Sequence, residues 1–344
     1  MPLVTPALVA LSLTLGTTLT LSSDHWLLAW AGLEINTLAI IPLMTFKPHP
    51  RAIEAALKYF LTQATASALI LFSALISACY TGQWYIHSLE DLPTNALTIA
   101  LMMKLGLVPT HLWMPEVIQG IPLSTGLILS TWQKLAPMAL IFQSSHLMNL
   151  NLTIFLGLAS IVVAGWSGIG QTQLRKILAF SSIGHLGWTI IIVKFSPELA
   201  LLNFILYVIM TTAAFLTLIS MNITKMTEFS TSFHKIPHLA LLTTLLLLSL
   251  AGLPPFTGFI PKLLIITALI NNNAMLMAAV IMVTSMLSLF FYLRLSYLLT
   301  QVMPPNILNS PSLWRTNKNY RAVYTLINFL ALVTFPLIPP LMVV

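Results

Sequence analysis

The chain has 344 residues, of which 58% are hydrophobic and only 7% are charged. Soluble domains carry about 25% charged residues and fewer than about 50% apolar ones, so this composition excludes a soluble globular fold and predicts an all-α polytopic membrane protein. The net charge of +7 comes without a run of four basic residues, which excludes nucleic acid as a partner. The single cysteine, Cys79, excludes an internal disulfide and an iron–sulfur cluster held by this chain alone.

Eleven apolar segments follow one another along the chain. A hydrocarbon core about 30 Å thick needs about 20 helical residues, and the polar, Pro and Asn clusters divide the chain into pieces of about that length. We place these transmembrane helices at 3–21, 25–44, 54–79, 95–115, 124–144, 150–170, 174–194, 198–220, 238–271, 275–299 and 322–343. The connections between them are loop-sized and leave no room for a soluble domain, so we predict a single transmembrane domain over residues 1–344.

Lysine and arginine fall almost entirely on one side of this arrangement. Only Lys194 lies in the loops that follow the odd-numbered segments. Because cytoplasmic or matrix loops are enriched in basic residues, the N-terminus is predicted on the inner side and the C-terminus on the outer side. The nine basic residues in the loops after the even-numbered segments are Lys47, Arg51, Arg175, Lys176, Lys225, Lys235, Arg315, Lys318 and Arg321.

Two segments contain helix breaks beside a lysine. In the fourth, Pro109 follows Lys104; in the ninth, Pro254 and Pro255 precede Lys262. Proline removes the hydrogen bond to the carbonyl four residues earlier, and the ninth segment, with 34 residues, would cover roughly 51 Å as one straight helix. Irregular backbone at membrane depth is tolerated only inside protein or beside a wet cavity. We therefore interpret both breaks as marks of an internal polar pathway.

The two breaks also suggest an internal repeat. If segments one to five and six to ten form two units, each broken helix is the fourth member of its unit, and the odd number of helices inverts the second unit. This pattern is typical of inverted-repeat transporters with a working site at the repeat interface. The predicted repeats cover about 1–145 and 150–300, followed by a final helix at about 322–343.

Four charged residues lie deep within the predicted spans: Glu34, Lys104, Lys134 and Lys262. Each costs about 2.5 to 3.5 kcal/mol to insert at the bilayer centre. One inert ion pair would explain Glu34 and one lysine, but two lysines would remain, and a buried lysine without a partner is poised to gain and lose a proton. We favour a proton relay through these groups. His185, in mid-span, is a further candidate, although a neutral imidazole bonded to a hydroxyl or carbonyl explains it equally well.

Metal or haem binding has no support, because no two histidines lie three or four residues apart within a span. A packing kink remains the alternative for a single proline.

Five long segments resemble the antiporter-like membrane subunits of respiratory complex I, a group related to subunits of sodium/proton antiporters. They are spread over residues 25 to 262 and follow one another in matching order. They read HWLLAWAGLEIN (25–36), KYFLTQATAS (58–67), KLGLVPTHLWMPE (104–116), QTQLRKILAFSSIGH (171–185) and GLPPFTGFIPK (252–262).

The resemblance implies a place in the proton-pumping arm of a respiratory-chain NADH dehydrogenase in the mitochondrial inner membrane. It implies that Glu34 and Lys104 form an ion pair that responds to neighbouring subunits, that Lys134 is the central proton carrier, and that Lys262 is the terminal lysine. The cofactors of the complex, NADH, FMN, iron–sulfur clusters and ubiquinone, would bind in other subunits. The expected partners are other membrane-arm subunits and membrane lipids, with cardiolipin as a candidate.

The sequence is therefore compatible with three functions. We expect a proton-translocating subunit coupled to electron transfer from NADH to ubiquinone elsewhere in the complex. A stand-alone cation/proton antiporter would use the same residues without partners. A structural or assembly subunit would keep the helices but would be indifferent to neutralising the lysines.

Overall fold

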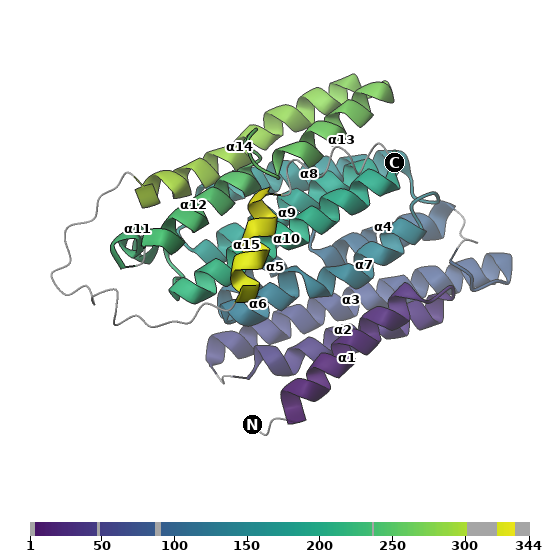
Figure 1. The fold of residues 1–344 in the computed structure, drawn as a ribbon. Helices are drawn as coiled ribbons and strands as arrows, with labels where there is room; N and C mark the ends of the chain where they lie inside the picture. Colours follow the sequence, from purple (N-terminus) through teal and green to yellow (C-terminus); the bar gives the residue numbers. More distant parts are fainter. Residues whose placement is uncertain (1–3, 47–48, 87–90, 236, 301–321, 334–344) are drawn as a thin grey trace. The chain divides into compact units, whose positions relative to one another are not determined.

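A computed structural model describes residues 4–46, 49–86, 91–235, 237–300 and 322–333 (Figure 1). Within these ranges every regular element is an α-helix. The helices are α1 (Val4–Leu21), α2 (Trp26–Met44), α3 (Pro50–Thr81), α4 (Asp91–Leu105), α5 (Trp113–Gly120), α6 (Leu123–Ser130), α7 (Trp132–Gln143), α8 (Leu150–Ile169), α9 (Leu174–Val193), α10 (Pro197–Met221), α11 (Met226–Lys235), α12 (Pro237–Ala251), α13 (Phe259–Asn271), α14 (Met275–Thr300) and α15 (Ala322–Val333).

The predicted breaks in the fourth and ninth segments are confirmed: α4 and α5 divide the fourth, and α12 and α13 divide the ninth. The fifth segment was predicted as one helix, and this is wrong, because it is divided into α6 and α7 at Thr131. The hydroxyls of Ser130 and Thr131 both donate to the carbonyl of Leu127. Hydroxyl side chains that bond nearby carbonyls compete with the helical pattern and bend it.

Residues 221–237 were predicted as a loop, but they contain the amphipathic helix α11. Phe229 is fully buried on one face of α11, whereas Glu228 is exposed on the other. The Glu228 carboxylate accepts hydrogen bonds from the backbone N–H groups of Thr224 and Lys225, at 3.1 and 3.4 Å. These bonds, the one from Thr224 first, hold the pKa of Glu228 below its usual range. A glutamate at this position satisfies donors that the first helical turn leaves open.

Six helices in the described part of the chain are long and apolar enough to cross a membrane: α2, α3, α8, α9, α10 and α14. The predicted orientation remains a prediction. Four of the basic residues behind it, Lys47, Arg315, Lys318 and Arg321, lie outside the described residues, as does the end of the predicted final helix.

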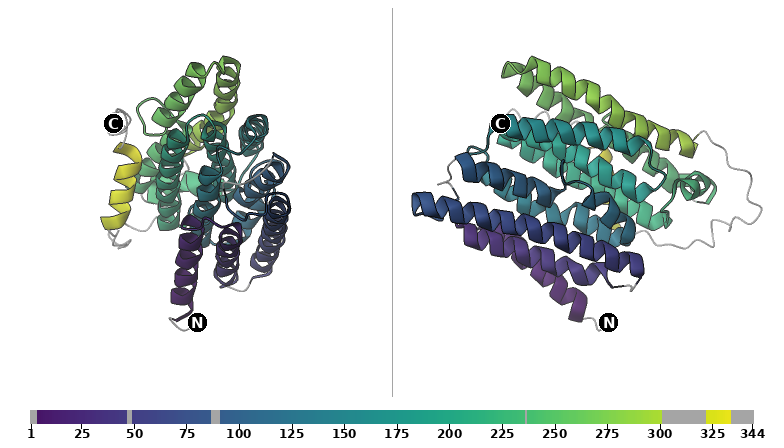
Figure 2. Two further views of the ribbon diagram at one scale, coloured as in Figure 1. Left: turned by 90° about the vertical axis from the view of Figure 1, so that its right-hand side faces the viewer. Right: turned by 180° about the vertical axis from the view of Figure 1, so that it is seen from behind.

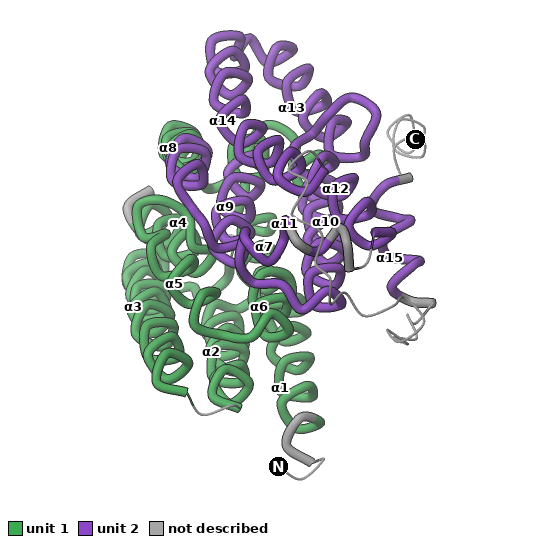
Figure 3. Tube along the Cα trace, turned by 90° about the vertical axis from the view of Figure 1, so that its left-hand side faces the viewer, with its two compact units in different colours: residues 1–160, 189–200 green, residues 161–188, 201–344 purple. Residues whose placement is uncertain are grey.

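The chain divides into two compact units (Figure 3). Unit 1 comprises residues 1–160 and 189–200, and unit 2 comprises residues 161–188 and 201–344.

In unit 1, the long helix α3 packs against α2, α4 and α5, and α2 packs against α1 (Figure 2). Glycines allow α1 and α2 to approach closely: an ideal Cβ on Gly16 would lie 3.0 Å from the carbonyl oxygen of Gly32. Small residues at helix interfaces allow this kind of backbone contact in membranes.

In unit 2, α12 packs against α11, α14 and α15, and α13 packs against α14. The hydroxyl of Thr257, in the break between α12 and α13, donates to the carbonyl of Ala331 in α15 at 2.6 Å. The end of α15 is thereby attached to the broken helix.

We expect Gly32→Ala to destabilise the contact between α1 and α2. The added Cβ would lie 2.7 Å from Cγ2 of Thr20 and 2.9 Å from the carbonyl oxygen of Gly16, so the helices must separate. Overpacking of this kind costs about 1 to 3 kcal/mol, which a lower melting temperature of the assembled protein would report. Gly170→Ala is the matched control, because nothing lies within 4 Å of its Cβ position. Equal melting temperatures for the two variants would contradict the expectation.

Candidate functional site

The first break lies between α4 and α5 in unit 1. Helix α4 ends at Leu105, and Gly106 follows with a φ of +79°. The N–H of Gly106 bonds the carbonyl of Met103 at 3.1 Å, and the N–H of Leu107 bonds the carbonyl of Met102 at 3.0 Å. This is a Schellman motif, in which glycine adopts the left-handed conformation that closes a helix. The helix therefore ends at Leu105, four residues before Pro109, which the sequence had identified as the cause of the break.

Lys104 and Lys134 line one cavity in unit 1, which encloses about 350 Å³ of empty space. Lys104 lies in the last turn of α4 and is 5% exposed, whereas Lys134 lies in the first turn of α7 and is 3% exposed. The other polar or aromatic residues of this lining are Asn36, Thr37, Tyr59, Gln63, Trp113 and Gln133. The structure thus brings together two of the predicted lysines from different helices.

Glu34, on α2, is half-buried, and its Oε2 atom has no hydrogen-bond partner. The Nζ atom of Lys104 has no hydrogen-bond partner either. Among the described residues, Glu34 and Lys104 are not joined by an ion pair, in contrast to Lys58, which forms ion pairs with Glu54 and Glu116. The pair that the resemblance implies is therefore open in this structure.

Several residues of this cavity were missed by the sequence analysis. The side chain of Asn36 is 1% exposed, and both of its amide atoms lack a hydrogen-bond partner. Gln133 donates to the backbone carbonyl of Asn36 at 2.9 Å. Buried polar atoms without a protein partner are the groups that ordered water satisfies. Their only signal in the sequence is an amide side chain in mid-span, which also occurs at ordinary helix contacts.

The second break lies between α12 and α13 in unit 2 and has the same backbone pattern. Gly252 has a φ of +82°, its N–H bonds the carbonyl of Ser249 at 3.0 Å, and the N–H of Leu253 reaches the carbonyl of Leu248 at 3.4 Å. The carbonyl of Ala251, which Pro255 leaves without its helical partner, accepts a hydrogen bond from Nζ of Lys262 at 2.7 Å. Lys262 therefore lies beside the break, as the sequence predicted, and forms a hydrogen bond with it.

Lys262 also lines a second cavity, with about 320 Å³ of empty space, and its Nζ lies 5.9 Å from the ring centroid of Trp188. His185 lines the same cavity, and its ring lies 5.9 Å from that of Tyr207. Thus two predicted site residues, Lys262 and His185, share one cavity in unit 2. Trp188, Tyr292 and Ser181 also line this cavity, and the sequence analysis did not identify Trp188 or Tyr292 as part of the site.

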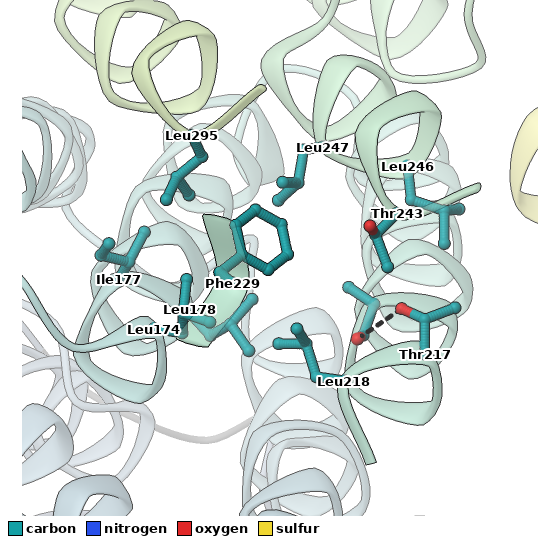
Figure 4. Close-up of a pocket in the computed structure, with 11 residues that line it drawn as sticks. Leu174, Ile177, Leu178, Thr217, Leu218, Phe229, Thr243, Leu246, Leu247 and Leu295 are labelled. Atoms are coloured by element: carbon teal, nitrogen blue, oxygen red, sulfur yellow. Dashed lines mark hydrogen bonds between the residues drawn. The ribbon is translucent and has the colours of Figure 1, made fainter. Parts of the chain in front are cut away.

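A third cavity in unit 2 carries no ionisable group (Figure 4). Its lining is mostly leucine, and its two hydroxyls, on Thr217 and Thr243, donate to carbonyls of their own helices. It is therefore part of the apolar core. Among the residues that the structure describes, no group of three or more His, Cys, Asp and Glu could hold a metal ion.

Family comparisons agree with this architecture. Residues 23–288 match the family described as NADH:quinone oxidoreductase/Mrp antiporter, transmembrane region, and residues 289–342 match the NADH dehydrogenase subunit 2 C-terminus. Curated proteins named NADH-ubiquinone oxidoreductase chain 2 are similar over nearly the full length. The protein of Aquarana catesbeiana is 65% identical over 96% of both chains, and that of Salmo salar is 54% identical over 95% of both.

Two solved structures have the same fold. A chain of respiratory complex I from Thermus thermophilus with bound aureothin is 28% identical, with a TM-score of 0.84, covering 97% of this chain and 78% of that one. A chain of the Mrp complex from Dietzia sp. is 20% identical, with a TM-score of 0.75, covering 84% and 59% of the two chains.

The helical fold and its two interrupted helices define an antiporter-like membrane protein. Within that class, the chain belongs to the NADH-ubiquinone oxidoreductase chain 2 family.

We expect Gly252→Ala to displace Lys262. The new Cβ would lie 2.8 Å from Nζ of Lys262 and would also strain a backbone with positive φ. Gly82→Ala is the matched control, because it introduces the same strain, at a φ of +69°, with nothing within 4 Å. A density map of the assembled Gly252→Ala variant should show the Lys262 amine away from the Ala251 carbonyl. An unchanged Lys262 and melting temperatures equal for both variants would contradict this account.

Proposed function

We propose that the three lysines that line the cavities, Lys104, Lys134 and Lys262, carry protons across the membrane. Family membership makes the chain a membrane-arm subunit of proton-pumping NADH:ubiquinone oxidoreductase, or respiratory complex I. The observation that carries the proposal is the position of Lys104 and Lys134, both buried and both on one polar cavity. A buried amine in a polar cavity can take up and release a proton at comparable free energy, as each step of a relay requires.

In this scheme, electron transfer to ubiquinone in other subunits changes the interaction between Glu34 and Lys104. Closing or opening this pair changes the proton affinity of Lys134, and then that of Lys262 in unit 2. His185, on the same cavity as Lys262, is a candidate for one further transfer step. The open arrangement of Glu34 and Lys104 supports the proposal, because it leaves room for a closed state with a different electrostatic field at the cavity.

The energies permit this coupling. Moving one charge against 100 mV requires about 2.3 kcal/mol. Two unit charges 4 Å apart attract one another by about 4 kcal/mol at an effective dielectric constant of about 20. Making and breaking one ion pair can therefore supply the work for one proton.

We propose further that the redox chemistry, with NADH, FMN, iron–sulfur clusters and ubiquinone, takes place in other subunits, which the single cysteine of this chain supports. The partners would be the neighbouring membrane-arm subunits and the lipids of the mitochondrial inner membrane. The basic loops support an N-terminus on the matrix side and a C-terminus on the side of the intermembrane space.

Lys134→Met tests the relay. In the assembled complex we expect NADH-driven turnover coupled to proton pumping to fall about a hundredfold, the lower end of the range for loss of a group that transfers a proton. Turnover and proton yield would be measured together in sealed vesicles, with assembly checked by the amount of intact complex. Lys225→Met, which changes an exposed lysine on α11's N-terminal side, should leave both unchanged.

The same measurement separates the competing functions. A purely structural subunit predicts full turnover and proton yield in Lys134→Met once assembly is normal, and this result would refute the relay. A stand-alone antiporter predicts cation-driven proton exchange by the isolated chain in vesicles, which we do not expect.

A further inference from the structure

A charged cluster outside the two lysine-bearing cavities joins α3 to α5 in unit 1. Nζ of Lys58 lies 2.7 Å from Oε1 of Glu54, one turn earlier on α3, and 2.7 Å from Oε2 of Glu116 on α5. The three side chains are 43%, 62% and 50% exposed, respectively. The sequence indicates the pair within α3 by its spacing of four residues, but it gives no sign of Glu116.

The position of the cluster along α3 places it near the edge of the membrane. Helix α3 has 32 residues, which corresponds to roughly 48 Å and exceeds the hydrocarbon core by about 18 Å. Lys58 lies about 12 Å from the start of α3. The cluster is thus partly exposed near the end of α3, while its amine is bonded to two carboxylates.

Helix α5 depends on contacts of this kind for its position. It has only eight residues, and so short a helix is not stable without tertiary contacts. Three successive contacts hold it along α3. The ring of Trp113 meets that of Tyr59 at 5.7 Å, Glu116 binds Lys58, and an ideal Cβ on Gly120 would lie 2.7 Å from the Cβ of Ala55. The Glu116–Lys58 bond is the only one of the three that is ionic.

The N-terminal end of α5, at Trp113, adjoins the first break. Nε1 of Trp113 donates to the carbonyl of Met103 at 3.3 Å, and an ideal Cβ on Gly106 would lie 3.1 Å from Cζ2 of the same ring. Trp113 lines the cavity together with Lys104 and Tyr59. A shift of α5 therefore moves the indole that contacts the last turn of α4, where Lys104 lies.

We propose that Lys58 is a positioning residue for proton transfer: by holding Glu116, it fixes the second half of the broken helix and, through Trp113, the surroundings of the Lys104 amine. Lys58 itself carries no proton across the membrane. The proposal rests on the proposed role of Lys104, and the experiment is arranged so that the two can fail separately.

Lys58→Met in the assembled complex should lower coupled turnover about fivefold, the effect of losing one good ion pair. It should also shift the pH profile of turnover, because the environment of a titrating amine changes. Trp113→Phe, which removes the Nε1–H, should shift the profile in the same direction. The double variant should shift it no further, since both changes act on the same contact.

Matched variants separate the bond to Glu116 from the rest of the cluster. Glu116→Gln should reproduce Lys58→Met, whereas Glu54→Gln should have a smaller effect because Lys58 keeps its partner on α5. Lys58→Arg should restore the profile, since a guanidinium can bridge two carboxylates. Exchanging the charges with Lys58→Glu and Glu116→Lys should recover most of the turnover lost in either single variant.

Three results would overturn the proposal: normal turnover and pH profile in Lys58→Met, additive shifts in the double variant with Trp113→Phe, or equal effects of Glu54→Gln and Glu116→Gln. If Lys58→Met does not assemble, Glu116→Gln, which keeps the side-chain shape, carries the same comparison. Lys104→Met, measured in parallel, separates the two proposals. An impaired Lys104→Met with a normal Lys58→Met removes only the positioning role, whereas normal behaviour of Lys104→Met removes the role of Lys104 itself.

Discussion

A backbone carbonyl inside a membrane needs a hydrogen-bond partner, because the hydrocarbon offers none. Both interrupted helices of this chain meet that constraint in the same way. A glycine with positive φ, Gly106 or Gly252, closes the first half-helix, and the following leucine bonds back to the helix. At the second break a side chain also takes part, because Lys262 donates to the carbonyl of Ala251. The lysine thus satisfies the backbone while the break holds the amine in place.

The two breaks share a sequence register that becomes clear only with the structure. In each, the second half-helix restarts seven residues after the glycine, at Trp113 and at Phe259. The tenth residue after the glycine is Glu116 in the first break and Lys262 in the second. Lys262 donates to the carbonyl of Ala251 in its own break, whereas Glu116 binds Lys58 on α3. The same glycine-terminated break is therefore followed by two different contacts. In unit 2 the lysine bonds a carbonyl of its own break, and in unit 1 the glutamate forms an ion pair with α3.

The sequence predicted the charged part of the site because a charge in an apolar span is costly and conspicuous. Lys104, Lys134 and Lys262 all line cavities in the structure. The amides were not predicted, because Asn36 and Gln133 cost little at a helix contact and look the same in either role. The fifth segment divides where the hydroxyls of Ser130 and Thr131 bond one carbonyl, a local detail that periodicity does not reveal. Helix α11 was not predicted, because it has few apolar residues and its polar residues are also typical of a loop.

By itself, the sequence determined that the protein is helical and membrane-embedded, where two of its helices break, and which ionisable groups lie within apolar segments. These features follow from composition and local chemistry, namely hydropathy, proline and the cost of burying charge. Only the tertiary structure decided that Lys104 and Lys134 share one cavity, that Glu34 stands apart from Lys104, and that α5 is fixed by an ionic contact to α3. Those facts depend on distances between residues far apart in the chain, which packing sets and no local pattern encodes.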